Sequence, residues 1–163
     1  MSTITEDLAD ALSGVLRSGD FFASGTCEIP APGLVVAGVG PISLPVLPAQ
    51  AQALIAAADR APYGRGARTL VDTDVRRTWQ IDADQVDFTG RTWARSLTGI
   101  VARAAAGLGV DGLIEAQLYK LLVYDEGAFF LSHRDSEKSA GMFATLVVAL
   151  PSQFVHPCLT KCR

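Results

Sequence analysis

His133 and Asp135 stand two residues apart and are the residues whose types and spacing point most directly to chemistry. In an extended strand, residues i and i+2 project from the same face, so this imidazole and this carboxylate would converge on one point. They are two of the three ligands of a 2-His-1-carboxylate facial triad, which leaves open positions on Fe(II) for substrate and O₂. The pair therefore predicts a metal site. The alternative reading of the same residues is a strand-end histidine beside a solvated acid.

Two other sequence patterns are weaker evidence for a functional site. Residues 107–112 match G-x-G-x-x-G, but a dinucleotide loop follows a strand and opens a helix, whereas this run follows a predicted helix and opens a predicted strand. We interpret it as helix termination. His133-Arg134-Asp135 also resembles part of the kinase catalytic loop, which requires an asparagine five residues after the aspartate. Position 140 is alanine and the chain has no asparagine, so that reading is rejected.

The residues around the pair resemble the Fe(II)/2-oxoglutarate-dependent oxygenases of the prolyl 4-hydroxylase type. The shared order is a strand ending in tyrosine, a glycine-bearing turn, an aromatic pair, H-x-D, and a strand closing in Leu-Pro. In this chain these features are Tyr124, residues 125–127, Phe129 and Phe130, His133 and Asp135, and residues 143–151. Earlier similarity lies in residues 39–45, 61–66 and 75–81, and the whole resemblance covers about residues 20–152.

The resemblance implies a cofactor and a reaction. His133 and Asp135 would be the first two iron ligands, and Tyr124 would contact 2-oxoglutarate, or else be a half-buried strand aromatic. Phe129 and Phe130 would line the pocket or fill the core. Fe(II) is the implied cofactor, 2-oxoglutarate the co-substrate, and ascorbate a candidate addition. In such enzymes O₂ and 2-oxoglutarate give succinate and CO₂ while a C–H bond is hydroxylated. The substrate stays open between a protein and a small molecule.

The chain departs from the family pattern after Asp135. The family places a second histidine several strands later, followed by an Arg or Lys whose charge holds the far carboxylate of 2-oxoglutarate. Only 28 residues follow Asp135, and the tail over residues 153–163 is atypical. His156 is a further candidate ligand, Lys161 and Arg163 are candidate cations, and His156, Cys158 and Cys162 are an alternative zinc-type cluster.

We therefore interpret the sequence as an incomplete version of the domain, from a truncated or frame-shifted gene or a fragment. Its enzymatic activity is left uncertain. The alternative function is a non-catalytic remnant, or a fragment that binds a partner through its exposed sheet.

Hydrophobic periodicity predicts the elements that must position these residues. The chain should be α+β, because helices come first and β-rich runs follow. Helices are expected at residues 4–17 (capped by Thr5), 48–60 and 93–108, and strands at 33–37, 42–44, 69–71, 113–124, 128–135 and 143–150. The two tryptophans are expected in the core. The resemblance further implies a partial double-stranded β-helix (jelly roll) with packed helices: a support region over residues 1–110, the start of the β-helix over 111–152, and the tail.

Composition excludes several other classes. The chain has 163 residues and a net charge of −3, whereas nucleic-acid binding normally needs a basic excess. No apolar run reaches the roughly 18 residues of a membrane span, and the acidic N-terminus lacks the basic region of a signal peptide. Three cysteines do not suggest a disulfide framework. We expect a cytoplasmic chain without nucleic-acid or membrane partners, and the oligomeric state stays open.

Overall fold

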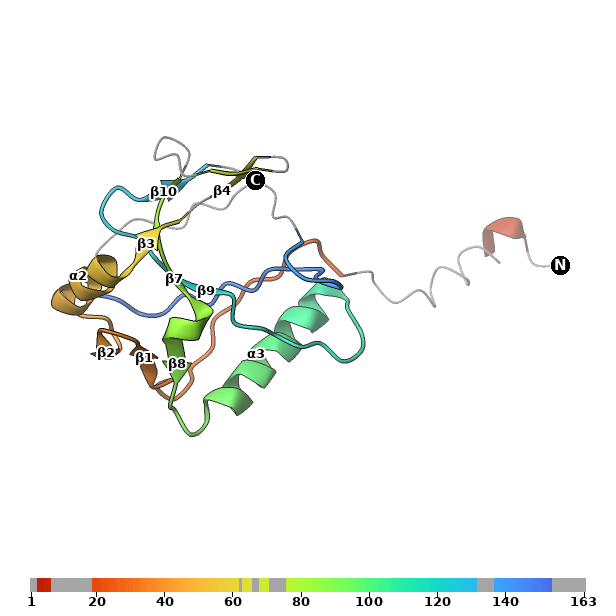
Figure 1. Cartoon of the computed structure of the whole chain (residues 1–163). Helices are drawn as coiled ribbons and strands as arrows, with labels where there is room; N and C mark the ends of the chain where they lie inside the picture. The colour runs from red at the N-terminus through yellow and green to blue at the C-terminus, as the bar shows by residue number, and fades with distance from the viewer. Residues whose placement is uncertain are drawn as a thin grey trace. The chain divides into compact units, whose positions relative to one another are not determined.

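Helices and short antiparallel strands make up the structure, which is α+β as predicted. This computed structural model describes residues 3–6, 19–61, 63–65, 68–70, 76–131 and 137–153. At residues 63–65, 68–70, 76–77 and 130 only the backbone is described. The chain divides into two compact units: Met1–Ile29 with Ala94–Ala116, and Pro30–Trp93 with Gln117–Arg163 (Figure 1). The expected division at residues 110 and 152 stays a prediction.

In the first unit, helix α3 is the main element. It runs from Trp93 to Leu108, which confirms the helix predicted from its apolar stripe. The extended segment before residue 30 is tied to it by two hydrogen bonds. The Asp20 N–H donates to the Gly107 carbonyl at 3.1 Å, and Arg103 Nη2 donates to the Thr26 carbonyl at 3.1 Å.

The start of the predicted N-terminal helix is also described. Residues 4–6 are helical, and Thr3 and Glu6 form a reciprocal capping box: the Thr3 N–H donates to Glu6 Oε2 at 2.7 Å, and the Glu6 N–H lies 3.4 Å from Thr3 Oγ1. The prediction of Thr5 as the cap is wrong, because Thr5 lies inside the helix. Hydrogen bonding to the Glu6 carboxylate, from the Thr3 backbone N–H first and from the Thr3 side chain second, holds the pKa of Glu6 below its ordinary value of 4.5. Residues 7–17 of the predicted helix lie outside the described residues.

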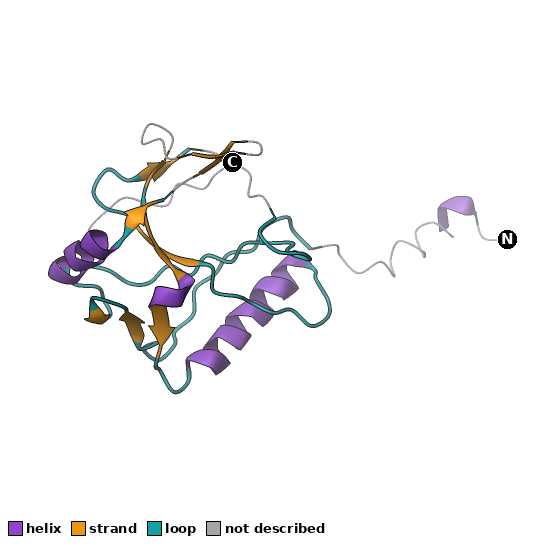
Figure 2. Cartoon of the chain, in the orientation of Figure 1, coloured by secondary structure: helices purple, strands orange, loops and turns teal. Residues whose placement is uncertain are grey.

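The second unit holds two three-stranded antiparallel sheets. One has the order β2–β1–β8, built from Gly40–Pro41, Leu34–Val36 and Val86–Phe88. The other has the order β3–β7–β9, built from Asp59–Arg60, Trp79–Asp82 and Lys120–Val123. A short 3-10 helix, Ala83–Gln85, connects β7 to β8 and so carries the chain from one sheet to the other (Figure 2).

Two shorter ladders complete this unit. Strand β4 (Tyr63–Arg65) pairs with β5 (Arg68–Leu70), and β6 (Arg76–Arg77) pairs with β10 (Phe129–Phe130). All the described pairings between strands are antiparallel, and they join neighbouring as well as distant segments of the sequence.

The core of the second unit joins both three-stranded sheets and helix α2 (Pro48–Ala57). Proline is well tolerated in the first turn of a helix, where its missing N–H leaves no bond unmade. Ala51 and Leu54, on the predicted stripe, are buried. The buried cluster consists of Leu34, Val36, Ile42, Leu54, Ile81 and Val86. Half-buried side chains such as Leu121, Val123 and Leu150 pack against it.

Several predicted strands are shorter than expected, and two are absent, at residues 42–44 and 143–150. Within 113–124 only Lys120–Val123 is a strand, and within the described part of 128–135 only Phe129–Phe130. Residues 143–150 are described without strand pairing, so the prediction of a strand there is wrong. The run is apolar and β-branched, but a strand also needs a partner edge, which the described residues do not supply. Val147 is accordingly 78% exposed.

Local pairing explains the remaining differences. Helix α2 ends at Ala57 rather than at residue 60, because Asp59–Arg60 pairs with β7 as strand β3. Residues 42–44 are not a strand, because the pairing with β1 ends where β1 begins: the Ile42 N–H donates to the Leu34 carbonyl at 2.8 Å, and Leu34 is the first residue of β1. The strand predicted at 33–37 is confirmed as Leu34–Val36.

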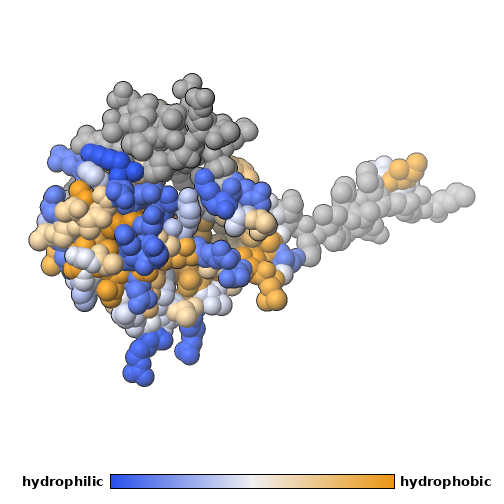
Figure 3. Space-filling model, viewed as in Figure 1, coloured by the Kyte–Doolittle hydropathy of each residue, from blue (hydrophilic) through white to orange (hydrophobic). Residues whose placement is uncertain are grey.

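No helix among the described ranges combines the length and apolar character needed to cross a bilayer. On the face in view, apolar and polar residues are interspersed (Figure 3). Exposed apolar side chains include Leu113, Leu118, Phe143, Leu146 and Val147.

Candidate functional site

The predicted metal pair lies outside the described residues. The structure describes the chain up to Leu131 and again from Glu137, so the geometry of His133 and Asp135 stays a prediction. What is described is the polypeptide that leads to the pair: strand β9, a loop, and strand β10.

Strands β9 and β10 pair with two strands, β7 and β6, that follow each other closely in the sequence. In β7, Trp79 pairs with Val123, and in β6, Arg77 pairs with Phe129. Between these pairs there is one residue on the first side, Thr78, and five on the other, Tyr124–Ala128. The two ladders are therefore one ladder interrupted by an insertion, which we call the bulge loop (Tyr124–Ala128). Bulges redirect side chains and are frequent beside functional sites.

Thr78 fixes the point where the ladder is interrupted. Its side chain is fully buried, and its Oγ1 lies 3.5 Å from the Phe129 carbonyl, a long hydrogen bond. Its own carbonyl accepts the N–H of Ala61 at 2.8 Å. Within the bulge loop, the Ala128 N–H donates to the Asp125 carbonyl at 3.0 Å and closes a turn. The strand that leads toward residue 133 thus starts from a defined position.

Three side chains from three elements meet beside this loop. The Arg60 guanidinium carbon, on β3, lies 3.6 Å from the centre of the Trp79 ring. The Trp79 Nε1–H donates to Asp125 Oδ2 at 3.2 Å. The indole therefore carries a cation on its face and a carboxylate at its edge, and it links β3, β7 and the bulge loop.

Each charged member of this group has a buried polar atom without a partner. Arg60 Nη1 and Asp125 Oδ1 are both buried and make no hydrogen bond within the described part of the chain. An unsatisfied buried polar group costs about 1–3 kcal/mol, and more when it is charged. Two such atoms of opposite charge flanking one indole mark a local exception to the rule that buried polar groups are satisfied.

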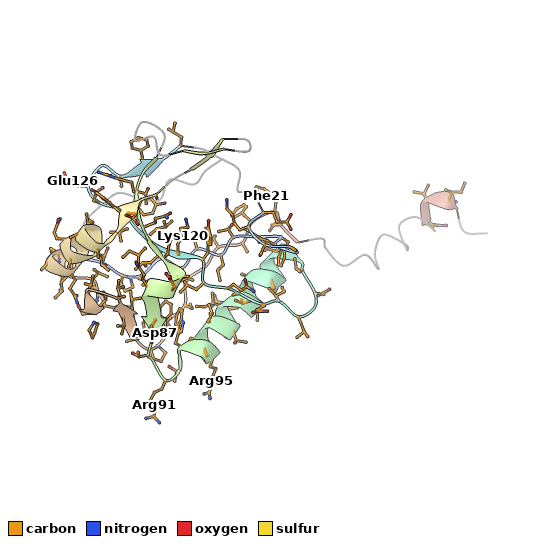
Figure 4. All side chains as sticks on the ribbon, viewed as in Figure 1. Phe21, Asp87, Arg91, Arg95, Lys120 and Glu126 are labelled. Carbon is orange, nitrogen blue, oxygen red and sulfur yellow. The ribbon has the colours of Figure 1, made fainter. Side chains whose placement is uncertain are left out.

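Tyr124, the predicted 2-oxoglutarate contact, opens the bulge loop. Its side chain is 54% exposed, so it is not the half-buried strand aromatic of the alternative reading. Phe129 is 37% exposed, which argues against a core-filling role, and the side chain of Phe130 is not among those described. In the same segment Glu126 is exposed, and Lys120 lies on β9, where its Nζ donates to Gln80 Oε1 on β7 at 2.6 Å (Figure 4).

Most of the other candidate metal ligands also lie outside the described residues. Among the described residues, no group of three His, Cys, Asp or Glu side chains is placed to hold a metal ion. The zinc-type cluster and the candidate cations stay untested. Like both ligands of the H-x-D pair, their residues lie outside the described ones: His156, Cys158, Lys161, Cys162 and Arg163. Cys27 is described, exposed and free.

Sequence reasoning did not find the Arg60–Trp79–Asp125 group. Trp79 was expected in the core, and it is instead half-buried with both its ring face and its N–H engaged. The available signal was a carboxylate directly after the strand that ends in Tyr124. Its partners are 46 and more positions away in sequence, and no local pattern joins them.

Comparison with known proteins gives no relative: no family model, curated protein or solved structure matches the chain.

Proposed function

We propose that the chain is an Fe(II)- and 2-oxoglutarate-dependent dioxygenase domain of the prolyl 4-hydroxylase type, with low activity. The observation that carries the proposal is the H-x-D pair preceded by Tyr124, a turn and an aromatic pair. The interrupted antiparallel ladder of β9 and β10 supports it, because that ladder gives the pair an extended approach. The finer fold proposal is a partial jelly roll with packed helices, in a cytoplasmic protein.

In this proposal each residue has a defined task. His133 and Asp135 hold the metal through an imidazole nitrogen and a carboxylate oxygen. The exposed Tyr124 hydroxyl donates a hydrogen bond to a carboxylate of 2-oxoglutarate. Bound Fe(II) supplies the O₂-dependent oxidation of a substrate C–H bond, and the protein supplies ligands and orientation.

Low activity is expected because few protein groups are available to bind 2-oxoglutarate and the metal. A charge-assisted hydrogen bond contributes about 1.5–3 kcal/mol. If neither Lys161 nor Arg163 holds the far carboxylate, 2-oxoglutarate affinity should be roughly 10- to 150-fold lower than with such an anchor. A metal held by two protein ligands rather than three is also bound more weakly.

Succinate release tests this function. The purified chain is assayed with Fe(II), ascorbate, O₂ and 2-oxoglutarate, beside His133→Ala and His156→Ala variants. We expect slow turnover that His133→Ala abolishes. Turnover that survives His133→Ala contradicts the assignment. Fast turnover lost in both variants would overturn the low-activity expectation and make His156 the missing ligand.

A second candidate function is non-catalytic partner binding. The specific observation is the exposed, uncharged run over residues 143–148, where Phe143 is 57% and Val147 78% exposed. Exposed β-prone segments are a template for pairing with a strand of another chain. A second copy of this chain is the proposed occupant, because two uncharged segments meet without like-charge repulsion. Sedimentation should then show a dimer that Val147→Lys disrupts and Leu113→Lys, at another exposed apolar position, does not.

A further inference from the structure

We propose that Trp79 is a positioning residue that holds the bulge loop through Asp125, and thereby sets where Tyr124 stands and where the strand toward His133 and Asp135 begins. The part that concerns the metal pair rests on the proposed function. The part that concerns the loop rests on described contacts alone.

The inference starts from the mismatch in the interrupted ladder. Five residues opposite one cannot continue the regular strand pairing, so the course of the bulge loop must be fixed by other contacts. The internal Ala128–Asp125 hydrogen bond closes the loop on itself. It does not attach the loop to the sheet.

The Trp79 indole supplies that attachment. Trp79 pairs with Arg60 on one side and with Val123 on the other, so its backbone is held in the centre of the β3–β7–β9 sheet. Its Nε1–H reaches Asp125 Oδ2, while Asp125 Oδ1 has no partner. The Asp125 side chain is therefore held by one hydrogen bond among the described residues. Removing that bond should release the loop while leaving the sheet pairing in place.

Arg60 makes the indole a firmer anchor. The guanidinium over the ring face restrains the plane of Trp79 and places a positive charge near the carboxylate that the indole binds. Trp93 provides the contrast, because it stacks on Phe88 with ring centres 4.6 Å apart and has no hydrogen bond to a carboxylate among the described contacts. Among the described contacts, Trp79 therefore differs from Trp93 in having an indole N–H that is bound to a carboxylate.

The test uses four variants of the full chain. Trp79→Phe keeps an aromatic face for Arg60 and removes the N–H, and Asp125→Ala removes the acceptor. Asp125→Asn keeps an acceptor oxygen, and Trp93→Phe is the matched control. Thermal unfolding verifies that each variant folds. If Trp79→Phe does not fold, the Asp125 variants still decide the question, because Asp125 lies in a loop.

Two quantities are measured. The first is the hydrogen-exchange rate of the Trp79 indole N–H, assigned by NMR from the two Trp→Phe variants. The second is the affinity for Co(II) in the presence of 2-oxoglutarate. We expect Asp125→Ala to speed indole exchange at least about threefold, and Asp125→Ala and Trp79→Phe each to weaken Co(II) affinity roughly 3- to 10-fold. Asp125→Asn should stay near the unmodified chain, and Trp93→Phe should not change Co(II) affinity.

The outcomes separate the two proposals. Unchanged indole exchange in Asp125→Ala overturns the inference at its first step. Faster exchange with unchanged Co(II) affinity overturns the positioning of the metal pair. Equal losses in Trp93→Phe would mean a general packing effect and also overturn it. If the unmodified chain shows no His133-dependent Co(II) binding, the proposed function fails, and the exchange rate alone decides whether Trp79 holds the loop.

Discussion

At the scale of single residues, the proposed chemistry belongs to the H-x-D pair, and the core of the second unit belongs to a few buried side chains. Ile81 is the clearest stability case, because it is 2% exposed and lies in the cluster that joins both three-stranded sheets. We expect Ile81→Ala to lower the free energy of unfolding by about 2–5 kcal/mol, through lost burial and the cavity left behind. Urea denaturation measures it. Leu113→Ala, at a fully exposed leucine, should change stability by less than about 0.5 kcal/mol, and equal losses would mean that the assigned core is wrong.

At this scale the sequence predicted the residues that a local pattern can reveal. The H-x-D pair follows from i, i+2 spacing, and Tyr124 follows from a family order that spans a few residues. The Arg60–Trp79–Asp125 group did not follow, because contacts between residue 60, residue 79 and residue 125 depend on strand pairing that no local spacing encodes.

Helices and strands were predictable where a single hydrophobic period extends over the whole element. Helix α3 begins and ends at the predicted residues, because its apolar stripe repeats at helical spacing over 16 residues. The strand expected over residues 143–150 was not found, because an apolar β-branched run specifies an extended chain but not its partner. Short strands such as β3 and β8 were missed because their pairing partners define them. Two or three residues are too few to show a hydrophobic alternation.

Two glycines, one on either side of β1, give a test of backbone conformation. Gly33 and Gly38 both have positive φ, +66° and +77°. A Cβ at Gly33 would lie 2.5 Å from the Gly90 nitrogen, whereas one at Gly38 would meet nothing within 4 Å. Gly38→Ala should cost about 1–2 kcal/mol for the left-handed conformation alone. Gly33→Ala should cost more, because the Gly90 backbone must also move. Equal losses of unfolding free energy would contradict the close approach.

The N-terminal capping box gives a pH test. The lowered pKa of Glu6 means that its stabilising contribution is present above the ordinary value of 4.5 and is lost as the pH falls through the lowered pKa. NMR titration of the Glu6 carboxyl carbon should give a midpoint below 4.5, and Thr3→Ala should move it upward. The rise should be partial, because alanine keeps the backbone N–H that is the larger cause, and a midpoint at or above 4.5 in the unmodified chain would contradict the assigned hydrogen bonds.

For the whole molecule, the α+β class was predictable from the order of helical and β-rich runs, whereas the division into two units was not. The first unit combines residues before 30 with 94–116, and the second combines 30–93 with the remainder. Each unit is discontinuous in sequence, and a grouping that depends on contacts between distant segments leaves no local sequence pattern. The proposed jelly roll belongs to this scale as well, because it concerns how short sheets join.

Metal binding tests the central claim most directly, since it needs neither substrate nor turnover. Co(II) is titrated anaerobically into the unmodified chain, His133→Ala, Asp135→Ala and Asp111→Asn, an exposed acidic residue of the first unit, with and without 2-oxoglutarate. The account predicts one weak site that 2-oxoglutarate strengthens. Its affinity should fall at least about tenfold in His133→Ala and in Asp135→Ala, the minimum loss typical of removing a residue that only supports a metal ligand. Asp111→Asn should match the unmodified chain. Equal affinity in His133→Ala and the unmodified chain would contradict the account.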